Sequence, residues 1–361
     1  MKKIMILAAA AALVFASCAK SEITSVNEEN QHAIGFGAYT PRAITKAAAA
    51  NYVAPGANLP LIANADFDVF GWITANGTSF TGSNGTKFFD SWYTVTFKAD
   101  GNTDGTKNAY PDGLRYWPTG TSPQWLSFYA YYPSNGTGIT APAAGLGKFT
   151  FTAQAAAANQ IDFMVSDVVK DKTYDNCTPT KGTVPLVFHH MLTKVVFKFT
   201  KTDVDAVVTI TGASLSGIKN TGDLTTAFNG TTTSMTWDNQ SGSEGYTVGY
   251  PTSALVYGTA YTSGNSADEV AADVLLMVPQ TIEADTQKLT ITWTVKSGSD
   301  ATVTNTATID LNDIKKSDNS HIDWAQNAQV TYTITVGPKP IYFTGSVDTW
   351  ASVTNGSIEV N

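Results

Sequence analysis

Apolar side chains recur at every second position along much of the chain. The pattern is clearest at residues 195–199, 289–295 and 330–336, and in the last two of these ranges threonine fills the intervening positions. A period of two is typical of β-strands that turn one face to a core and the other to water. The pattern therefore predicts antiparallel strands of a β-sandwich, with threonine on the wet face.

The first half of the chain predicts further strands. Runs rich in aromatic and aliphatic side chains occupy residues 67–73, 126–132 and 161–165. A shorter strand is predicted at residues 33–39, where Ile34, Phe36 and Ala38 share one face.

Composition narrows the fold class to all-β. Of 361 residues, 52 are threonine, 29 are glycine and 14% are charged. Threonine and aromatic residues favour strands, and so few charges argue against helical, coiled-coil or disordered chains. The net charge of −8 and the lack of a basic stripe argue against nucleic acid as a partner. Two cysteines are too few for a disulfide framework, so hydrophobic cores must supply the stability.

Turn composition changes little along the chain, so the domain boundaries depend on a few signals. An aromatic half gives way to threonine alternation near residues 185–192. We predict a signal peptide at 1–17, a tether at 18–32, β-sandwich domains at 33–190 and 191–336, and a strand-forming tail at 337–361.

The start of the chain predicts secretion. Lysines precede an apolar run of 13 residues, which is shorter than the roughly 20 that a membrane-spanning helix needs. The segment Phe15-Ala16-Ser17-Cys18 resembles the lipobox of bacterial lipoproteins, whose cysteine is acylated. This resemblance makes Cys18 the lipid attachment residue; an ordinary secretory signal with a chance cysteine is the alternative. Acylation of Cys18 would leave Cys177 without a disulfide partner.

A proline-rich hinge precedes the C-terminal tail. Residues 337–340 read Gly-Pro-Lys-Pro and interrupt the strand pattern, because each proline removes a ladder donor. The tail beyond is again strand-like, and it could pair within its own domain or in another molecule. Its apolar side chains are Ile341, Phe343, Val347, Trp350, Ile358 and Val360.

No catalytic, cofactor or metal motif is recognisable in the sequence. His189 and His190 are neighbours on a predicted strand, so they point to opposite faces and cannot easily share a metal ion. Asp66 and Asp68 could share a strand face, but such pairs are common on exposed strands. We therefore predict that the protein is not an enzyme and binds no cofactor or metal.

The aromatic first half permits a second interpretation. Four of its tryptophans could form a platform for sugar rings: Trp72, Trp92, Trp117 and Trp125. Core packing of a two-sheet sandwich is the simpler use for most of them. An outer-membrane, surface glycan-binding lipoprotein is therefore the alternative function.

An ordered set of segments carries a family resemblance. The segments are residues 116–118 (Tyr-Trp-Pro), 126–133 (Leu-Ser-Phe-Tyr-Ala-Tyr-Tyr-Pro), 160–165 (Gln-Ile-Asp-Phe-Met-Val), 187–195 (with Phe188-His189-His190) and 276–280 (Leu-Met-Val-Pro-Gln). The segment from Trp324 to Trp350 completes the set. Together they resemble Bacteroidales-type fimbrillins, the subunits of type V pili, from the leader to the last residue.

The resemblance implies two tandem transthyretin-like β-sandwiches, made as a lipoprotein and carried to the outer surface. In polymerising fimbrillins an arginine-specific protease cuts after the first strand, and the C-terminal strand of another subunit fills the freed groove. Carried over, the cut would fall between Arg42 and Ala43, with an uncut surface arginine as the alternative. The displaced strand would bear Ile34, Phe36 and Ala38, and the tail would be the donor strand.

These inferences predict a stalk or anchor subunit of a surface fimbria that supports adhesion. A tip subunit needs no donor strand, so a tail beyond a hinge favours the stalk or anchor role. The expected partners are other copies or related pilus subunits, the outer membrane through lipid on Cys18, and receptors on host or bacterial surfaces. The prolines are expected to keep the tail from folding back on its own sheet.

Overall fold

The computed structural model describes residues 32–39, 66–97, 108–109, 115–178, 181–263, 269–270, 274–316, 318–337 and 342–349. These residues form β-sheets, interrupted by the 3₁₀ turns η3 (Ala157–Asn159) and η4 (Leu311–Asp313). The prediction of an all-β fold is confirmed. Within these ranges no helix is long and apolar enough to cross a membrane.

The largest sheet, called the long sheet below, comes from the first half of the chain. In spatial order its strands are β1 (Gly35–Tyr39), β11 (Thr183–His190), β9 (Met164–Ser166), β6 (Trp125–Tyr132), β2 (Asp66–Thr74), β4 (Tyr93–Phe97) and β5 (Asn108–Ala109). Short strands attach to it at β10 (Val169–Lys172) and β3 (Thr86–Lys87). The strands predicted at residues 67–73 and 126–132 are thus confirmed.

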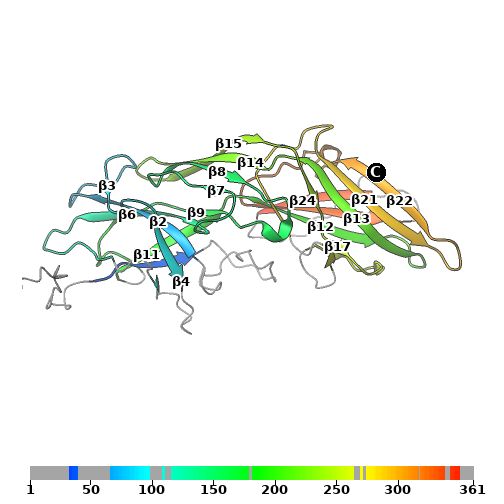
Figure 1. Cartoon of the computed structure of the whole chain (residues 1–361), viewed down its shortest axis with the longest axis horizontal. Helices are drawn as coiled ribbons and strands as arrows, with labels where there is room; N and C mark the ends of the chain where they lie inside the picture. Colours follow the sequence, from blue (N-terminus) through cyan, green and yellow to red (C-terminus); the bar gives the residue numbers. More distant parts are fainter. Residues whose placement is uncertain are drawn as a thin grey trace, which may run out of the picture. The chain divides into compact units, whose positions relative to one another are not determined.

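A second sheet, the shared sheet, combines strands from both sides of residue 190. Its order is β15 (Thr233–Ser241), β14 (Thr221–Phe228), β8 (Gly147–Thr152) and β7 (Ile139–Thr140). Figure 1 shows β14 and β15 running beside β8, although some 70 residues separate β8 from β14 in the sequence. The predicted boundary at residue 190 is therefore crossed by one hydrogen-bonded sheet.

The second half of the chain forms two further sheets. The tail sheet has the order β18 (Tyr261–Thr262), β12 (Thr193–Lys201), β23 (Ala328–Val336) and β24 (Tyr342–Thr349), with β20 (Leu275–Met277) also on β12. The threonine sheet has the order β16 (Glu244–Thr247), β13 (Val207–Ile218), β21 (Lys288–Lys296) and β22 (Val303–Asp310). A two-stranded ribbon pairs β17 (Tyr250–Pro251) with β19 (Glu269–Val270).

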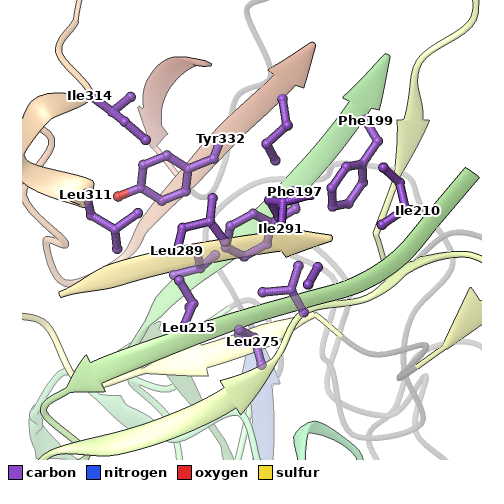
Figure 2. Close-up of a cluster of buried hydrophobic side chains, with 14 of the residues drawn as sticks. Phe197, Phe199, Ile210, Leu215, Leu275, Leu289, Ile291, Leu311, Ile314 and Tyr332 are labelled. Atoms are coloured by element: carbon purple, nitrogen blue, oxygen red, sulfur yellow. The ribbon is translucent and has the colours of Figure 1, made fainter. Parts of the chain in front are cut away.

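Apolar side chains between the sheets make the cores. In the second half, side chains of the tail sheet meet those of the threonine sheet, as Figure 2 shows for Phe197 and Tyr332 beside Leu289 and Ile291. In the first half, one face of the long sheet packs on the shared sheet and its other face carries a separate core. The apolar faces predicted from the period of two are the ones that lie in these cores.

Two details differ from the predicted pattern. The pairs β1 with β11 and β12 with β23 are parallel, which the long connections between these strands permit. The strand predicted at residues 161–165 is confined to its end, where β9 begins at Met164. Asp162 lies just before β9, and its fully buried carboxylate bonds to His190. Residues 161–163 therefore hold a side-chain contact and do not extend the strand.

Candidate functional site

The first strand occupies an edge of the long sheet and is held on two sides. On one side β1 pairs in parallel with β11 over five residue pairs. On the other side, the residues leading into β1 bond to residues 115–117. Ile34 N donates to the Arg115 carbonyl (2.7 Å), and Trp117 N donates to the His32 carbonyl (2.9 Å).

The inward face of this strand is fully buried. Ile34 and Phe36 are both 0% exposed and belong to the core on the outer face of the long sheet. The Phe36 ring lies edge-on to Phe128 (5.2 Å between centroids) and to Phe67 (6.5 Å). Burial of two such side chains contributes about 3–6 kcal/mol. The predicted shared face of Ile34 and Phe36 is therefore confirmed.

Aromatic rings and one glycine hold the beginning of this strand. His32 stacks on Tyr174 with ring centroids 3.7 Å apart. The Gly182 carbonyl accepts bonds from Gly35 N (2.8 Å) and from Trp117 Nε1 (3.1 Å). Gly182 has φ +73°, and a Cβ there would lie 2.7 Å from the Tyr174 ring. A side chain at this position would displace the contacts that hold β1.

The tail pairs with its own half of the chain. β24 forms an antiparallel ladder of eight residue pairs with β23. Val347 packs against the core between the tail sheet and the threonine sheet, and a Cβ on the buried Gly345 would collide with the Ile322 side chain. The expectation that the prolines keep the tail off its own sheet is wrong for residues 342–349. The prolines precede the ladder and occupy none of its positions, so they do not prevent pairing.

The adjacent histidines bond to separate carboxylates. His190 Nδ1 lies 2.9 Å from Asp162 Oδ1, and both side chains are almost fully buried. His189 Nε2 lies 2.8 Å from Asp167 Oδ2 near the surface. The prediction that they point to opposite faces is confirmed. Among the residues that the structure describes, no group of His, Cys, Asp and Glu could hold a metal ion.

The two aspartates of the second strand have different environments. Asp66 is exposed, whereas Asp68 is buried and accepts bonds from Tyr131 Oη (2.6 Å), Thr94 Oγ1 (2.7 Å) and Ser134 Oγ (2.7 Å). Burial, together with the Asp68 carboxylate, raises the pKa of Tyr131 far above its ordinary value. These bonds fasten β2 to β4 and β6, so the network stabilises the sheet.

Most of the candidate platform tryptophans are core residues. Trp72 and Trp117 are buried in the two cores of the first half. Trp92 packs against one of these cores and donates its Nε1 proton to the Pro142 carbonyl (2.7 Å), while Trp125 is partly exposed. The use of most of them for core packing is confirmed.

Several predicted site residues lie outside the described residues. They are Cys18, Arg42, Ala43, Ile341, Trp350, Ile358 and Val360, together with the side chains of Ala38 and Phe343. The Arg42–Ala43 bond belongs to the connection between β1 and β2. Cys177, a free thiol, is buried in the same core as Phe36, and burial raises its pKa to about 11.

Sequence reasoning missed the hairpin of β14 and β15, through which the second half of the chain contributes two strands to the shared sheet. The Phe228 ring of β14 stacks with Phe80 at 5.9 Å, and Lys170 Nζ donates to the Gly230 carbonyl (2.7 Å). The alternation of residues 221–228 is a strand signal, but it contains nothing that selects β8 as the partner.

Comparisons with known proteins bear on the family and on the fold of the chain. The family model described as fimbrillin-like matches residues 45–355. A fimbrial protein from Bacteroides vulgatus is 20% identical, covers 89% of this chain and 100% of its own, and has a TM-score of 0.59. A candidate cell adhesion protein from Bacteroides uniformis is 14% identical over 90% of this chain and 99% of its own, with a TM-score of 0.48. The tip fimbrial protein Mfa3 from Porphyromonas gingivalis is 8% identical, covers 88% of this chain and 100% of its own, and has a TM-score of 0.38.

The first of these likenesses shows that the fold is shared. No curated protein matches the sequence significantly.

Proposed function

The chain belongs to the fimbrillin-like family, and on that basis we propose that it polymerises by exchanging β1 for the tail of another subunit. Family membership makes it a structural, non-enzymatic subunit of a pilus at the cell surface, which assembles with other fimbrial subunits. Within the fimbria we propose a stalk or anchor role that supports adhesion, with lipid on Cys18 holding the subunit at the outer membrane during export. The edge position of β1 is the observation that carries the proposal.

The proposed first step is cleavage between Arg42 and Ala43. This bond is part of the only covalent link between β1 and the rest of the domain. While the link is intact, β1 remains near its groove at an effective concentration on the order of millimolar. After cleavage β1 is retained by non-covalent contacts, which among the described residues are its ladder to β11, its bonds to residues 115–117, the Gly35 bond to Gly182, the stack of His32 on Tyr174 and two buried side chains. Dilution then favours release.

The vacated groove is a template for another strand. Departure of β1 leaves a row of unpaired amides along β11 and a hollow that Ile34 and Phe36 had filled. An exposed edge above an apolar hollow favours β-augmentation by an extended segment.

The tail carries side chains of the kind that the groove loses. Ile341-x-Phe343 repeats the order and spacing of Ile34-x-Phe36, so a strand entering parallel to β11 would place like side chains in the same hollow. Tyr342 would take the position of Gly35, where a Cβ lies 3.0 Å from Thr183 Oγ1, so that hydroxyl would have to turn aside.

The tail is also longer than the strand it would replace. β1 spans five residues, whereas the tail adds further apolar side chains at Val347, Trp350, Ile358 and Val360. Trp350, Ile358 and Val360 would each contribute about 1.5–3 kcal/mol if fully buried, which offsets the cost of releasing β24 from β23. Val347 adds less, because it already packs against the core of its own half. β24 is itself an edge strand, so its release breaks a single ladder.

An arginine-specific protease gives a sharp test, because the chain has just two arginines, Arg42 and Arg115. Cleaved protein should form a ladder of polymers on a denaturing gel, and Arg42→Lys should abolish both cleavage and polymers. Arg115→Lys is the matched control and should leave both intact. Deletion of residues 338–361 should allow cleavage but no polymers. Polymers without cleavage, or from the truncated chain, would contradict the mechanism.

A further inference from the structure

The described sheets end in three long edge strands, β15, β22 and β24. An edge strand exposes unpaired N–H and C=O groups, and natural sheets protect such edges with bulges, charged residues or proline. β24 is the tail strand already discussed. The other two differ sharply in their protection.

The edge formed by β15 is protected in two ways. Its ladder with β14 changes register between Thr221 and Asp223, so an extra residue bulges out of the strand. Asn239 in this bulge has φ +54°, and the exposed Asp238 places a charge beside it. A bulge of this kind twists an edge away from flat pairing.

The edge formed by β22 lacks every one of these protections. It pairs with β21 over eight consecutive residue pairs without a register shift, and it contains no proline. Its single charged residue is Asp310 at the very end. That carboxylate accepts a bond from Asn312 N (2.9 Å) and lies 3.5 Å from Lys288 Nζ. In the part of the chain that the structure describes, β22 has no partner on its outer side.

We propose that β22 is a self-association surface, on which the β22 strand of a second copy of this chain pairs antiparallel about a two-fold axis at Thr306. The register follows from the side chains. On the inner face, Val303 is 57% exposed and Ile309 is only partly buried against the core. An axis at Thr306 places Val303 of each copy opposite Ile309 of the other, so both apolar side chains become less exposed to water.

The outer face is equally self-complementary. Thr292 and Thr306 hydroxyls lie 3.2 Å apart, and those of Thr290 and Thr308 lie 2.9 Å apart, which makes a threonine ladder between β21 and β22. The same axis places Thr304 opposite Thr308 and continues this ladder into the second copy. Cross-strand threonine pairs are favourable. The Asp310 carboxylates fall outside the paired region, so no like charges meet.

One such contact is small, but a fibre repeats it many times. Arrays of weak contacts bind far more tightly than one contact does. Pairing of two β22 strands does not require strand exchange at β1. In fibres formed by the proposed exchange, the same pairing would join one fibre laterally to the next.

Cysteine cross-linking tests the register directly. In protein that carries Cys18→Ser and has met no protease, Thr306→Cys places two thiols on the axis. Opposite Cα atoms of an antiparallel pair lie about 4.5–5.5 Å apart, within the range that a disulfide spans. Thr236→Cys, at a position on β15 that is likewise exposed, is the matched control. We expect at least ten times more disulfide dimer from Thr306→Cys. Equal cross-linking at the two positions would overturn the proposal.

A charge substitution provides an independent readout. Thr306→Lys would bring two ammonium groups together on the axis, whereas Thr236→Lys would not. The concentration needed for self-association in sedimentation equilibrium should rise at least tenfold for Thr306→Lys alone. Unchanged association of that variant, with an unchanged melting temperature, would also overturn the proposal.

Discussion

Truncation of Phe36 to alanine measures how firmly the first strand is held. The ring is fully buried and lies edge-on to Phe128 and Phe67, with centroids 5.2 and 6.5 Å away. Loss of a buried phenylalanine ring costs about 3–5 kcal/mol. At 1.36 kcal/mol per tenfold change, the docking equilibrium of β1 should weaken by about 200- to 5000-fold.

The expected effect depends on whether the chain is cleaved. In the intact protein β1 can detach locally while the remaining sheets stay folded, so its amides should exchange hydrogen much faster. The Gly35 amide, bonded to the Gly182 carbonyl, reports on this opening. After arginine-specific cleavage, Phe36→Ala protein should lose its N-terminal fragment at dilutions at which the unsubstituted protein retains it. Size-exclusion chromatography with mass spectrometry measures that retention.

Phe199→Ala is the matched control, because Phe199 is equally buried but lies in the core of the second half. It should lower the melting temperature and leave fragment retention unchanged. If Phe36→Ala also lowered the melting temperature while the fragment stayed bound as in the unsubstituted protein, β1 would unfold only with the whole domain. Cleavage alone could not then open the groove.

Three further predictions concern stability. Gly82 and Gly120 both have positive φ, but only a Cβ on Gly82 collides with the backbone of the β14–β15 hairpin. Gly82→Ala should therefore lower the melting temperature much more than Gly120→Ala does. Equal losses would contradict the packing of that hairpin. Hydrogen bonds, first from Asn239, lower the pKa of Asp223 to about 2. The folded pKa is below the unfolded value of about 3.9, so this stabilisation is present above that value and is lost as pH falls toward 2. Asp223→Asn should flatten the unfolding free energy across that range in urea titrations. Partial burial lowers the pKa of Lys194 to about 8, below the unfolded value of about 10.4. Between these two pH values the unfolded chain binds more protons, so the free energy of unfolding should rise with pH. Lys194→Met should abolish that rise and stabilise the protein at pH 7.

The strand predictions were correct where the pattern involves neighbouring residues only. Residues 289–295 and 330–336 alternate strictly, and both lie within strands of the second-half core. The inward face of Ile34 and Phe36 was predictable for the same reason, since a period of two assigns alternate residues to one face. The strand predicted at residues 161–165 was shortened because Asp162 turns inward to His190, a contact across 28 residues of sequence.

Around β1, only part of the candidate site was predictable. His32, Tyr174 and Gly182 hold the start of the strand, yet they are scattered along the chain and share no motif. Their association depends on the turn that brings Gly182 beside Gly35. No spacing rule in the sequence reports such a meeting.

The amino-acid sequence by itself determined that the chain is all-β, which faces of its strands are apolar, and that it resembles pilus subunits. Each of these properties is read from neighbouring residues or from ordered motifs. Only the tertiary structure decided which strands pair: β1 with β11 in parallel, β24 with β23, and β14 with β8. Every strand presents the same kind of backbone donors and acceptors, and apolar faces recur on many of the strands. The choice of partner therefore depends on how the side chains fill three cores at once.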